Sequence, residues 1–244
     1  MSQSQPTVVL RQGTYTGRHL EKTEDGLTPL PRPLDAFLGI PYAQASRFCK
    51  PITLPASEDT FSATEPGEVC PASVERDANL GLQESEDCLN LNVWTPTRGE
   101  EGQGKKLPVI IYVHGGAFNM GYGLDRNIAN FVSYSAEGIV GVSFNYRLGA
   151  LGFLPLEIDE TEKGVEAEGC TLNLGLWDQR MAFEWVRDNI GSFGGDCEKV
   201  TLMGVSAGAH AVSPSPPLVL NTFPPYSTYS FCTSSFMPCP TCSG

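Results

Sequence analysis

Residues 200–208, which read VTLMGVSAG, carry the strongest structural signal in this 244-residue chain. The first four are apolar or β-branched and favour a strand, and residues 207–211 favour the start of a helix. Between them, residues 204–208 have the G-x-S-x-G spacing of a sharp strand-to-helix turn that exposes the oxygen of Ser206. The same spacing also occurs in ordinary glycine-serine loops, but the strand before it and the helix after it favour the sharp turn.

A second strand-end motif begins at His114. Residues 109–113 (VIIYV) form an apolar, mostly β-branched run, which is typical of a strand buried on both faces of a parallel sheet. Gly115 and Gly116 follow, and their backbone N–H groups, with that of Ala207, are candidate donors to the negative oxygen that forms when a serine attacks a carbonyl. A flexible turn at the end of the strand is the alternative interpretation of this glycine pair.

The rest of the chain alternates short apolar strands with helical segments. Strands are expected at residues 7–10, 14–17, 36–40, 89–94, 139–144 and 200–203, and helices at 124–135 and 177–190. Residues 89–94 alternate Leu with Asn and predict a strand with one buried face. Residues 50–87 are expected to form a long surface excursion, and residues 98–106 a turn. This order predicts an α/β fold with a mostly parallel sheet and flanking helices.

Composition and charge exclude several classes of protein. A hydrophobic content of 41% indicates a globular chain, and a net charge of −12 argues against binding to nucleic acid or to anionic membranes. The sequence has no apolar run long enough for a transmembrane helix. The N-terminus lacks the basic and apolar regions of a secretory signal, so a cytoplasmic location is expected, or a secreted one if the natural N-terminus differs. The oligomeric state stays open.

The eight cysteines do not form a metal-binding pattern. Only Cys239 and Cys242 have the C-x-x-C spacing, and they have no second pair and no histidine partners, so this match is interpreted as chance. The sequence therefore predicts no metal site and no cofactor.

Residues 213–244 differ abruptly from the rest of the chain. They contain no charged residue, and the last charge in the sequence is Lys199. We expect two parts, a folded part at residues 1–212 and a Pro/Ser/Thr/Cys-rich tail at 213–244. A genuine low-complexity tail is one explanation, and a reading frame lost near Val212 is the one we favour. A sheet that ends at the 200–203 strand would expose a strand edge, which predicts an unstable or insoluble chain.

Six ordered blocks give the chain a specific family resemblance. They are residues 37–43 (FLGIPYA), 85–93 (SEDCLNLNV), 112–118 (YVHGGAF), 145–153 (NYRLGALGF), 173–180 (NLGLWDQR) and 194–196 (GGD). From about residue 7 to about residue 210, the chain resembles the N-terminal part of a type-B carboxylesterase, the family that includes cholinesterases and fungal lipases. The resemblance implies an α/β-hydrolase fold, truncated after the nucleophile turn, and hydrolysis of small-molecule carboxylic esters without a cofactor.

The resemblance also implies roles for individual residues. Ser206 matches the nucleophile, and Gly115, Gly116 and Ala207 match the oxyanion donors. The implied structural pairs are a disulfide between Cys70 and Cys88 and ion pairs between Arg47 and Glu86 and between Arg147 and Asp178. Two positions depart from the family: Val205 stands where Glu is usual, and Cys197 where Pro is usual. The first change is expected to weaken support of the site, and the second to be tolerated in a loop.

A third departure concerns the catalytic acid and base. The family takes both from sequence after the serine, whereas the residues after Ser206 contain no Asp or Glu. The chain has three histidines: His19 lies near the N-terminus, His114 belongs to the glycine loop, and His210 lies one helical turn beyond the serine rather than over its oxygen. Without a base a serine hydroxyl is a weak nucleophile.

The function predicted from sequence is therefore a serine-dependent carboxylic ester hydrolase, expected to be inactive as written. The alternatives are a non-catalytic, cholinesterase-like binding module and a non-functional fragment. Retention of Ser206 favours the hydrolase, since a binding module has no need of a nucleophile.

Overall fold

A computed structural model describes residues 4–23, 26–73, 81–97, 104–154 and 172–212, and the backbone of residues 228–232. The strands are β1 (Thr7–Leu10), β2 (Gly13–Thr16), β3 (Arg18–Lys22), β4 (Pro29–Pro41), β5 (Thr60–Ser62), β6 (Asn90–Pro96), β7 (Leu107–Val113), β8 (Val140–Phe144), β9 (Gly195–Val205) and β10 (Thr228–Cys232). The helices are α1 (Ile128–Ser133), α2 (Gly149–Phe153), α3 (Leu174–Asn189), the 3-10 helix η4 (Ile190–Phe193) and α4 (Ala207–Ala211).

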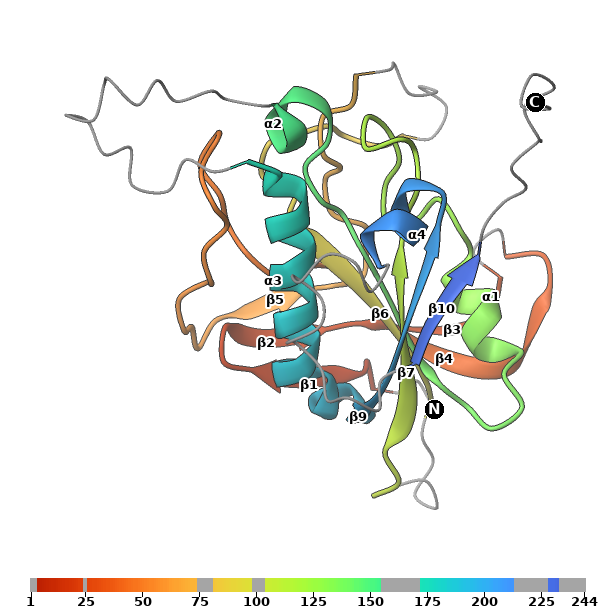
Figure 1. Cartoon of the computed structure of the whole chain (residues 1–244). Coiled ribbons are helices and arrows are strands. Elements are labelled where there is room, and N and C mark those ends of the chain that lie inside the picture. Colours follow the sequence, from red (N-terminus) through yellow and green to blue (C-terminus); the bar gives the residue numbers. More distant parts are fainter. Residues whose placement is uncertain are drawn as a thin grey trace, which may run out of the picture.

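A seven-stranded sheet forms the centre of the fold, in the order β10-β9-β7-β8-β6-β4-β3. Strands β8, β7, β9 and β10 are parallel, whereas β6, β4 and β3 pair antiparallel with their neighbours. A smaller sheet contains β1, β2 and β5. Helix α3 lies on one side of the main sheet and α1 on the other (Figure 1). The predicted α/β fold is confirmed, and the sheet is mixed.

Both faces of the central strands are buried in separate apolar clusters. In β7, Ile111 and Val113 pack in the cluster on the α3 side, whereas Tyr112 packs in the cluster on the α1 side. This follows from the period-two geometry of a strand, which sends successive side chains to opposite faces. Two covered faces explain why the strand is an unbroken apolar run rather than an alternating one.

The prediction that β6 has one buried face is wrong. All seven of its residues are buried, because β6 lies between β4 and β8 and both of its faces are covered. The two asparagines are accommodated by hydrogen bonds. Asn92 Oδ1 accepts from the Gly39 N–H at 3.0 Å, and Asn90 Nδ2 donates to the Glu68 carbonyl at 2.7 Å. The Leu-Asn alternation therefore marks buried, hydrogen-bonded amides and not a solvated face.

Strand β4 is much longer than the predicted 36–40 segment. Its additional N-terminal residues contain Pro29, Pro31 and Pro33, and prolines normally argue against a strand because they cannot donate to the ladder. These prolines precede Leu34, which pairs with the last residue of β6, so among the described strands they have a neighbour only in β3. Because these prolines have a strand neighbour on one side only, the N–H groups that they lack interrupt fewer ladder hydrogen bonds.

Helix α1 is shorter than predicted. The Asn127 side chain accepts a hydrogen bond from the Asn130 N–H at 2.8 Å and so caps the helix at residue 128 rather than 124. The hairpin of β1 and β2, the buried strands β7 and β8, and helix α3 all lie where the sequence predicts them.

The predicted open edge beside the serine turn is also corrected. Strand β10 pairs parallel with β9, from Thr228 opposite Thr201 to Cys232 opposite Val205. A segment of the tail therefore covers the edge of residues 201–205. The sequence analysis did not predict this strand, although Thr228, Tyr229 and Phe231 are residues that favour strands. The boundary between residues 212 and 213 stays a prediction.

Candidate active site

Ser206 lies on a sharp turn between β9 and α4. Its backbone has φ 52° and ψ −119°, a conformation that L-residues rarely adopt, and the residue is exposed. The turn depends on the flanking glycines, because a Cβ on Gly204 would lie 2.4 Å from the backbone of Gly208. Backbone strain of this kind costs about 1–3 kcal/mol and persists only where the surroundings impose it.

The loop after β7 lies directly against this turn. A Cβ placed on Gly115 would be 3.3 Å from Cβ of Ser206 and 2.6 Å from the Val205 carbonyl oxygen. Within the described residues, the N–H groups of Gly115 and Gly116 donate no hydrogen bond. Ala207 is the first residue of α4, where a helix N–H has no partner within the helix. Gly115 and Ala207 therefore lie next to Ser206, and Gly116 follows Gly115 in the loop.

Backbone hydrogen bonds stabilise the glycine loop on the side of residues 118–120. The N–H groups of Asn119 and Met120 donate to the Gly116 carbonyl at 2.9 and 3.0 Å, and Gly149 donates to the Phe118 carbonyl at 2.7 Å. Ala117 and Phe118 have φ values of 52° and 59°. Two successive left-handed residues turn the chain tightly, and these bonds stabilise that turn.

His114 is part of this support and is not a candidate base. Its side chain is fully buried, stacks on the ring of Tyr146 at 4.2 Å between centroids, and its Nδ1 lies 2.8 Å from the Gly115 carbonyl oxygen. The Tyr146 hydroxyl donates to the His114 carbonyl at 2.8 Å. Burial is the largest cause that raises the pKa of Tyr146, with Asp125 and Tyr112 adding to it. Tyr146 therefore stays protonated and remains a donor.

The other two histidines are not positioned as a base for Ser206. His210 Nδ1 lies 3.1 Å from the Ser206 backbone carbonyl oxygen, one helical turn along α4. Within the described part of the chain, the Ser206 hydroxyl has no hydrogen-bond partner. His19 lies on β3, five strand positions from β9, which corresponds to about 24 Å across the sheet. The structure therefore brings Ser206 and the glycine loop together, and none of the three histidines lies over the Ser206 hydroxyl.

Comparison with known proteins shows the family of this chain. The sequence pattern described as the carboxylesterase family matches residues 4–216. The chain belongs to the carboxylesterase family. The match covers every element from β1 to α4, including both loops of the site.

Individual relatives cover the same region. The chain is 38% identical over 201 residues to the bile salt-activated lipase of Rattus norvegicus, an overlap of 80% of this chain and 30% of the lipase. It is 42% identical over 182 residues to the probable N-octanoylanthranilate hydrolase of Rhodococcus erythropolis, an overlap of 72% of this chain and 37% of that protein. The chain thus spans about a third of the length of these relatives.

Solved structures show the same fold. A PNB esterase superposes with a TM-score of 0.70 at 32% identity, over 90% of this chain and 42% of the esterase. The carboxylesterase-family chain therefore has the α/β-hydrolase fold that its sequence predicts.

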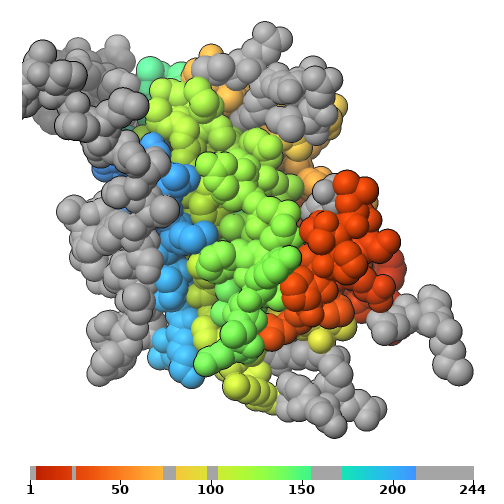
Figure 2. Space-filling model, turned by 90° about the vertical axis from the view of Figure 1, so that its right-hand side faces the viewer, coloured from red at the N-terminus to blue at the C-terminus, as the bar shows by residue number. Residues whose placement is uncertain are grey.

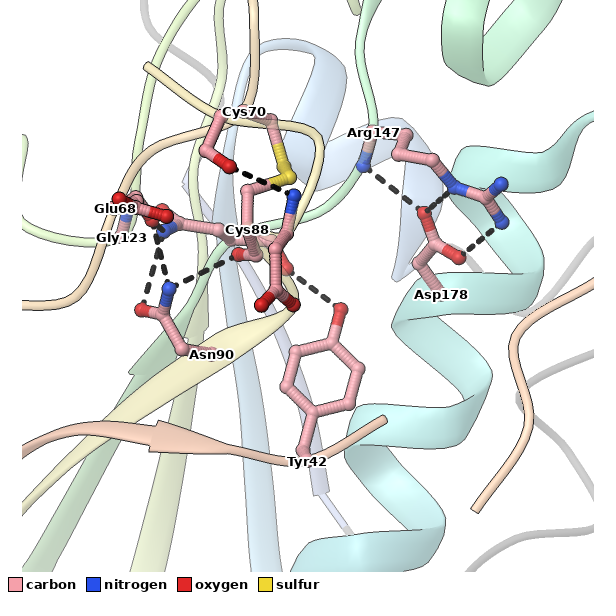
Figure 3. Close-up of a disulfide and its surroundings, with 11 residues drawn as sticks. Tyr42, Glu68, Cys70, Cys88, Asn90, Gly123, Arg147 and Asp178 are labelled. Atoms are coloured by element: carbon pink, nitrogen blue, oxygen red, sulfur yellow. Dashed lines mark hydrogen bonds and ion pairs between the residues drawn. A yellow bond between two sulfur atoms is a disulfide. The ribbon is translucent and has the colours of Figure 1, made fainter. Parts of the chain in front are cut away.

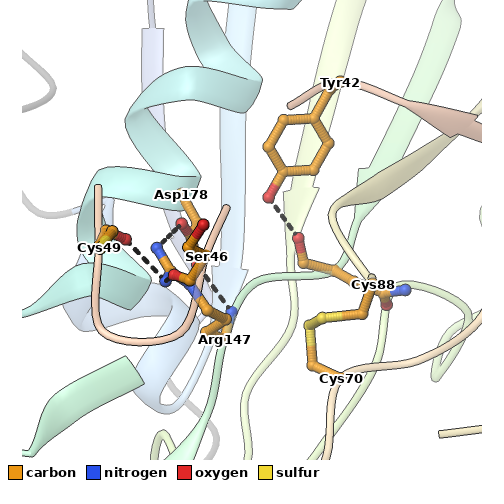
Figure 4. A network of polar contacts seen from close by, with 8 residues as sticks. Tyr42, Ser46, Cys49, Cys70, Cys88, Arg147 and Asp178 are labelled. Atoms are coloured by element: carbon orange, nitrogen blue, oxygen red, sulfur yellow. Dashed lines mark hydrogen bonds and ion pairs between the residues drawn. A yellow bond between two sulfur atoms is a disulfide. The ribbon is translucent and has the colours of Figure 1, made fainter. Parts of the chain in front are cut away.

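A buried ion pair anchors helix α3 of this carboxylesterase-family chain to the segment that follows β8. Arg147 Nε and Nη2 donate to the Asp178 carboxylate at 2.8 and 2.7 Å, and the Arg147 N–H donates to it at 3.0 Å (Figure 4). The side chains are 5% and 0% exposed. Arg147 Nη1 also donates to the Cys49 carbonyl at 2.8 Å. Burial raises the pKa of Asp178, and Arg147 opposes that shift.

The second predicted pair lies on the surface. Arg47 Nε lies 3.0 Å from both oxygens of Glu86, and the two side chains are 62% and 38% exposed. Hydrogen bonds from Arg47 are the main cause that lowers the pKa of Glu86. Solvent screens such a pair, so we assign it little weight in stability.

A disulfide joins Cys70 to Cys88 and closes a loop between residues 18 positions apart (Figure 3). Both cysteines are buried, and next to them Asn90 and Asn145 both donate to the Glu68 carbonyl, at 2.7 and 3.0 Å. Sequence reasoning gave Asn145 and Tyr146 no role, although both belong to the 145–153 block. Their polar side chains, within a mostly apolar block, could have indicated a hydrogen-bonding role, because buried polar groups need partners.

The described residues contain no cluster of three His, Cys, Asp or Glu side chains that could hold a metal ion. Cys239 and Cys242 lie outside the described residues. In the same part of the chain, no helix is both long and apolar enough to cross a membrane. Cys197, at the position where proline is usual, lies near the start of β9 and is partly exposed.

Proposed function

We propose that Ser206 is the nucleophile of a carboxylic ester hydrolase that acts on small-molecule esters. The observation that carries this proposal is the exposed, strained Ser206 beside the glycine loop, where the N–H groups of Gly115 and Gly116 donate no hydrogen bond to any described residue. A serine held in this way presents its Oγ to an acyl carbon while the neighbouring donors face the carbonyl oxygen.

The proposed reaction has two stages. Ser206 Oγ bonds to the acyl carbon and loses its proton, and the carbonyl oxygen takes up negative charge. The N–H groups of Gly115, Gly116 and Ala207 stabilise that charge, and the alcohol then leaves with a proton. Water hydrolyses the acyl-serine to release the acid. Loss of one oxyanion donor typically costs about 10²- to 10³-fold in rate.

The step for which no group is positioned is removal of the proton from Ser206 Oγ. None of the three histidines is placed to take the proton from Ser206 Oγ, so we propose that these 244 residues alone react slowly. In enzymes of this type, the oxyanion hole and binding alone leave roughly 10³- to 10⁴-fold acceleration over water. A full rate requires a base that this sequence does not provide after the serine.

Covalent labelling with a fluorophosphonate, with and without added imidazole, tests the proposal. We expect slow labelling of the purified chain, faster labelling when imidazole supplies a base, and none in Ser206→Ala. Labelling that survives Ser206→Ala would show that another group reacts.

A glycine variant tests the oxyanion loop separately. In Gly115→Ala the new methyl group meets the Val205 carbonyl, and we expect the labelling rate to fall by at least about 10²-fold. Gly191→Ala is the matched control, because a Cβ there has nothing within 4 Å. Equal labelling rates in the two variants would contradict the proposed loop function.

The competing proposal is a non-catalytic binding module. The observation in its favour is that His210 bonds to the Ser206 carbonyl rather than to its hydroxyl. Complete absence of labelling, with imidazole present and the chain folded, would support this alternative.

A further inference from the structure

Two consecutive peptide groups of the glycine loop have carbonyl oxygens that are bound by side chains. The Tyr146 hydroxyl donates to the His114 carbonyl at 2.8 Å, and His114 Nδ1 lies 2.8 Å from the Gly115 carbonyl oxygen. A carbonyl oxygen only accepts, so Nδ1 is the nitrogen that carries the hydrogen in the second bond. Each bond therefore fixes the plane of one peptide group, that between His114 and Gly115 and that between Gly115 and Gly116.

The planarity of these peptide groups decides where their N–H groups point. In a trans peptide, the C=O and the N–H that follows it point in opposite directions, and every described peptide bond is trans. The Gly115 N–H therefore points away from the Tyr146 hydroxyl, and the Gly116 N–H points away from His114 Nδ1. Neither N–H donates a hydrogen bond to any described residue. The two side chains thus hold these peptide groups by their carbonyls and leave the N–H groups on the opposite side.

The glycine pair needs such bonds because glycine restricts its own backbone least. Gly116 has a φ of 109°, and a Cβ on it would lie 2.2 Å from the Met120 carbonyl oxygen. A Cβ on Gly115 would lie 2.6 Å from the Val205 carbonyl oxygen. A larger residue therefore cannot stiffen the loop at either position, and neighbouring side chains must fix its peptide groups instead.

Tyr146 is itself held between two anchored neighbours. Its side chain is fully buried, and its ring stacks on the His114 ring at 4.2 Å between centroids. The carbonyl of Asn145 accepts from the Tyr42 hydroxyl at 2.7 Å, and Arg147 belongs to the buried ion pair described above. A side chain whose supports are themselves fixed by packing and hydrogen bonds places its hydroxyl accurately.

The serine turn lies against the same loop. Figure 2 shows the blue segment that contains β9 directly beside the yellow-green segment that contains β7 and the loop after it. A Cβ on Gly115 would be 3.3 Å from Cβ of Ser206. The peptide groups that Tyr146 and His114 fix are therefore next to Ser206.

We propose that Tyr146 is the positioning residue of the glycine loop. Its hydroxyl orients the Gly115 N–H, and its ring holds His114, which orients the Gly116 N–H. Both N–H groups then face the carbonyl oxygen of an ester whose acyl carbon lies at Ser206. This inference rests on the proposed function, because preorganised donors matter only where a negative oxygen forms. Tyr146 acts through the loop and not by contact with the substrate.

Tyr146→Phe tests this role, and Tyr42→Phe is the matched control. Each change removes one hydroxyl from a buried tyrosine that donates to a backbone carbonyl, at 2.8 and 2.7 Å, and each keeps the ring. We therefore expect similar losses of stability in urea unfolding. Fluorophosphonate labelling with imidazole should slow by about fivefold to tenfold in Tyr146→Phe, as for the loss of one hydrogen bond, and by less than about twofold in Tyr42→Phe.

NMR of the same peptide group gives a readout that does not depend on ester hydrolysis. The dipeptide His-Gly occurs once in the sequence, at residues 114–115. Histidine labelled with ¹³C at the carbonyl and glycine labelled with ¹⁵N therefore give one coupled signal. Loss of the Tyr146 hydroxyl should shift this signal, because the hydrogen bond polarises the peptide group. Tyr42→Phe should leave it in place.

The two measurements separate failure of this role from failure of the proposed function. An unchanged His114–Gly115 signal in Tyr146→Phe would overturn the role of Tyr146, and so would equal labelling rates in Tyr146→Phe and Tyr42→Phe with both chains folded. If the unsubstituted chain is not labelled at all, the proposed function fails, and the signal alone then supports or overturns the role. A shifted signal with slower labelling in Tyr146→Phe alone supports it.

Discussion

Replacement of Asp178 by asparagine should lower the free energy of unfolding by about 3–5 kcal/mol, because it leaves the Arg147 charge buried without its counterion. Asp178 is fully buried and Arg147 is 5% exposed, so water cannot replace the lost partner. The carboxylate accepts three hydrogen bonds from Arg147, two of them from the guanidinium. Hydrogen bonds to charged groups are worth about 1.5–3 kcal/mol each, and asparagine keeps only one acceptor oxygen.

Equilibrium unfolding in urea, followed by circular dichroism, measures this loss. Domains of this kind are stable by about 5–15 kcal/mol, so Asp178→Asn should shift the midpoint far toward low urea. Asp188→Asn is the control, because Asp188 pairs with Arg187 on the surface and should change stability by no more than about 0.5 kcal/mol. The double variant Arg147→Met/Asp178→Leu removes both charges and should be less destabilised than the sum of its single changes. A loss below about 1 kcal/mol in Asp178→Asn would refute the reasoning.

Three further predictions concern the serine turn, the disulfide and a histidine. Ser206→Gly should stabilise the chain by up to about 1 kcal/mol in urea unfolding while abolishing fluorophosphonate labelling, because glycine relieves the strained backbone. Reduction of the Cys70–Cys88 disulfide should lower the free energy of unfolding by about 3 kcal/mol, the value expected for a loop of this length, and unfolding with and without a reductant measures it. Desolvation lowers the pKa of His19, but hydrogen bonds to a carbonyl and a carboxylate outweigh it, so its pKa is raised. The stability contributed by protonated His19 is fully present below pH about 6.5 and lost as the pH rises through the folded pKa, so His19→Gln should cost more at pH 5 than at pH 8.

Some features of the candidate site can be predicted from local sequence, and others cannot. The G-x-S-x-G spacing and the paired glycines after β7 predict a turn and a donor loop, because both depend on short-range backbone geometry. No local pattern shows that Gly115 lies against Ser206, or that Tyr146 donates to the His114 carbonyl. Those contacts join segments about 30 to 90 positions apart, and packing of the whole sheet decides them.

The sequence by itself determined the α/β class, the buried strand β7, helix α3 and the position of the G-x-S-x-G turn, since each follows from periodicity or glycine spacing within one segment. Tertiary structure decided what depends on neighbours. It buried both faces of β6 around hydrogen-bonded asparagines, extended β4 through its prolines, and paired β10 with the edge of β9. The physical reason is that a strand's partners supply its burial and its backbone hydrogen bonds, and those partners come from distant parts of the chain.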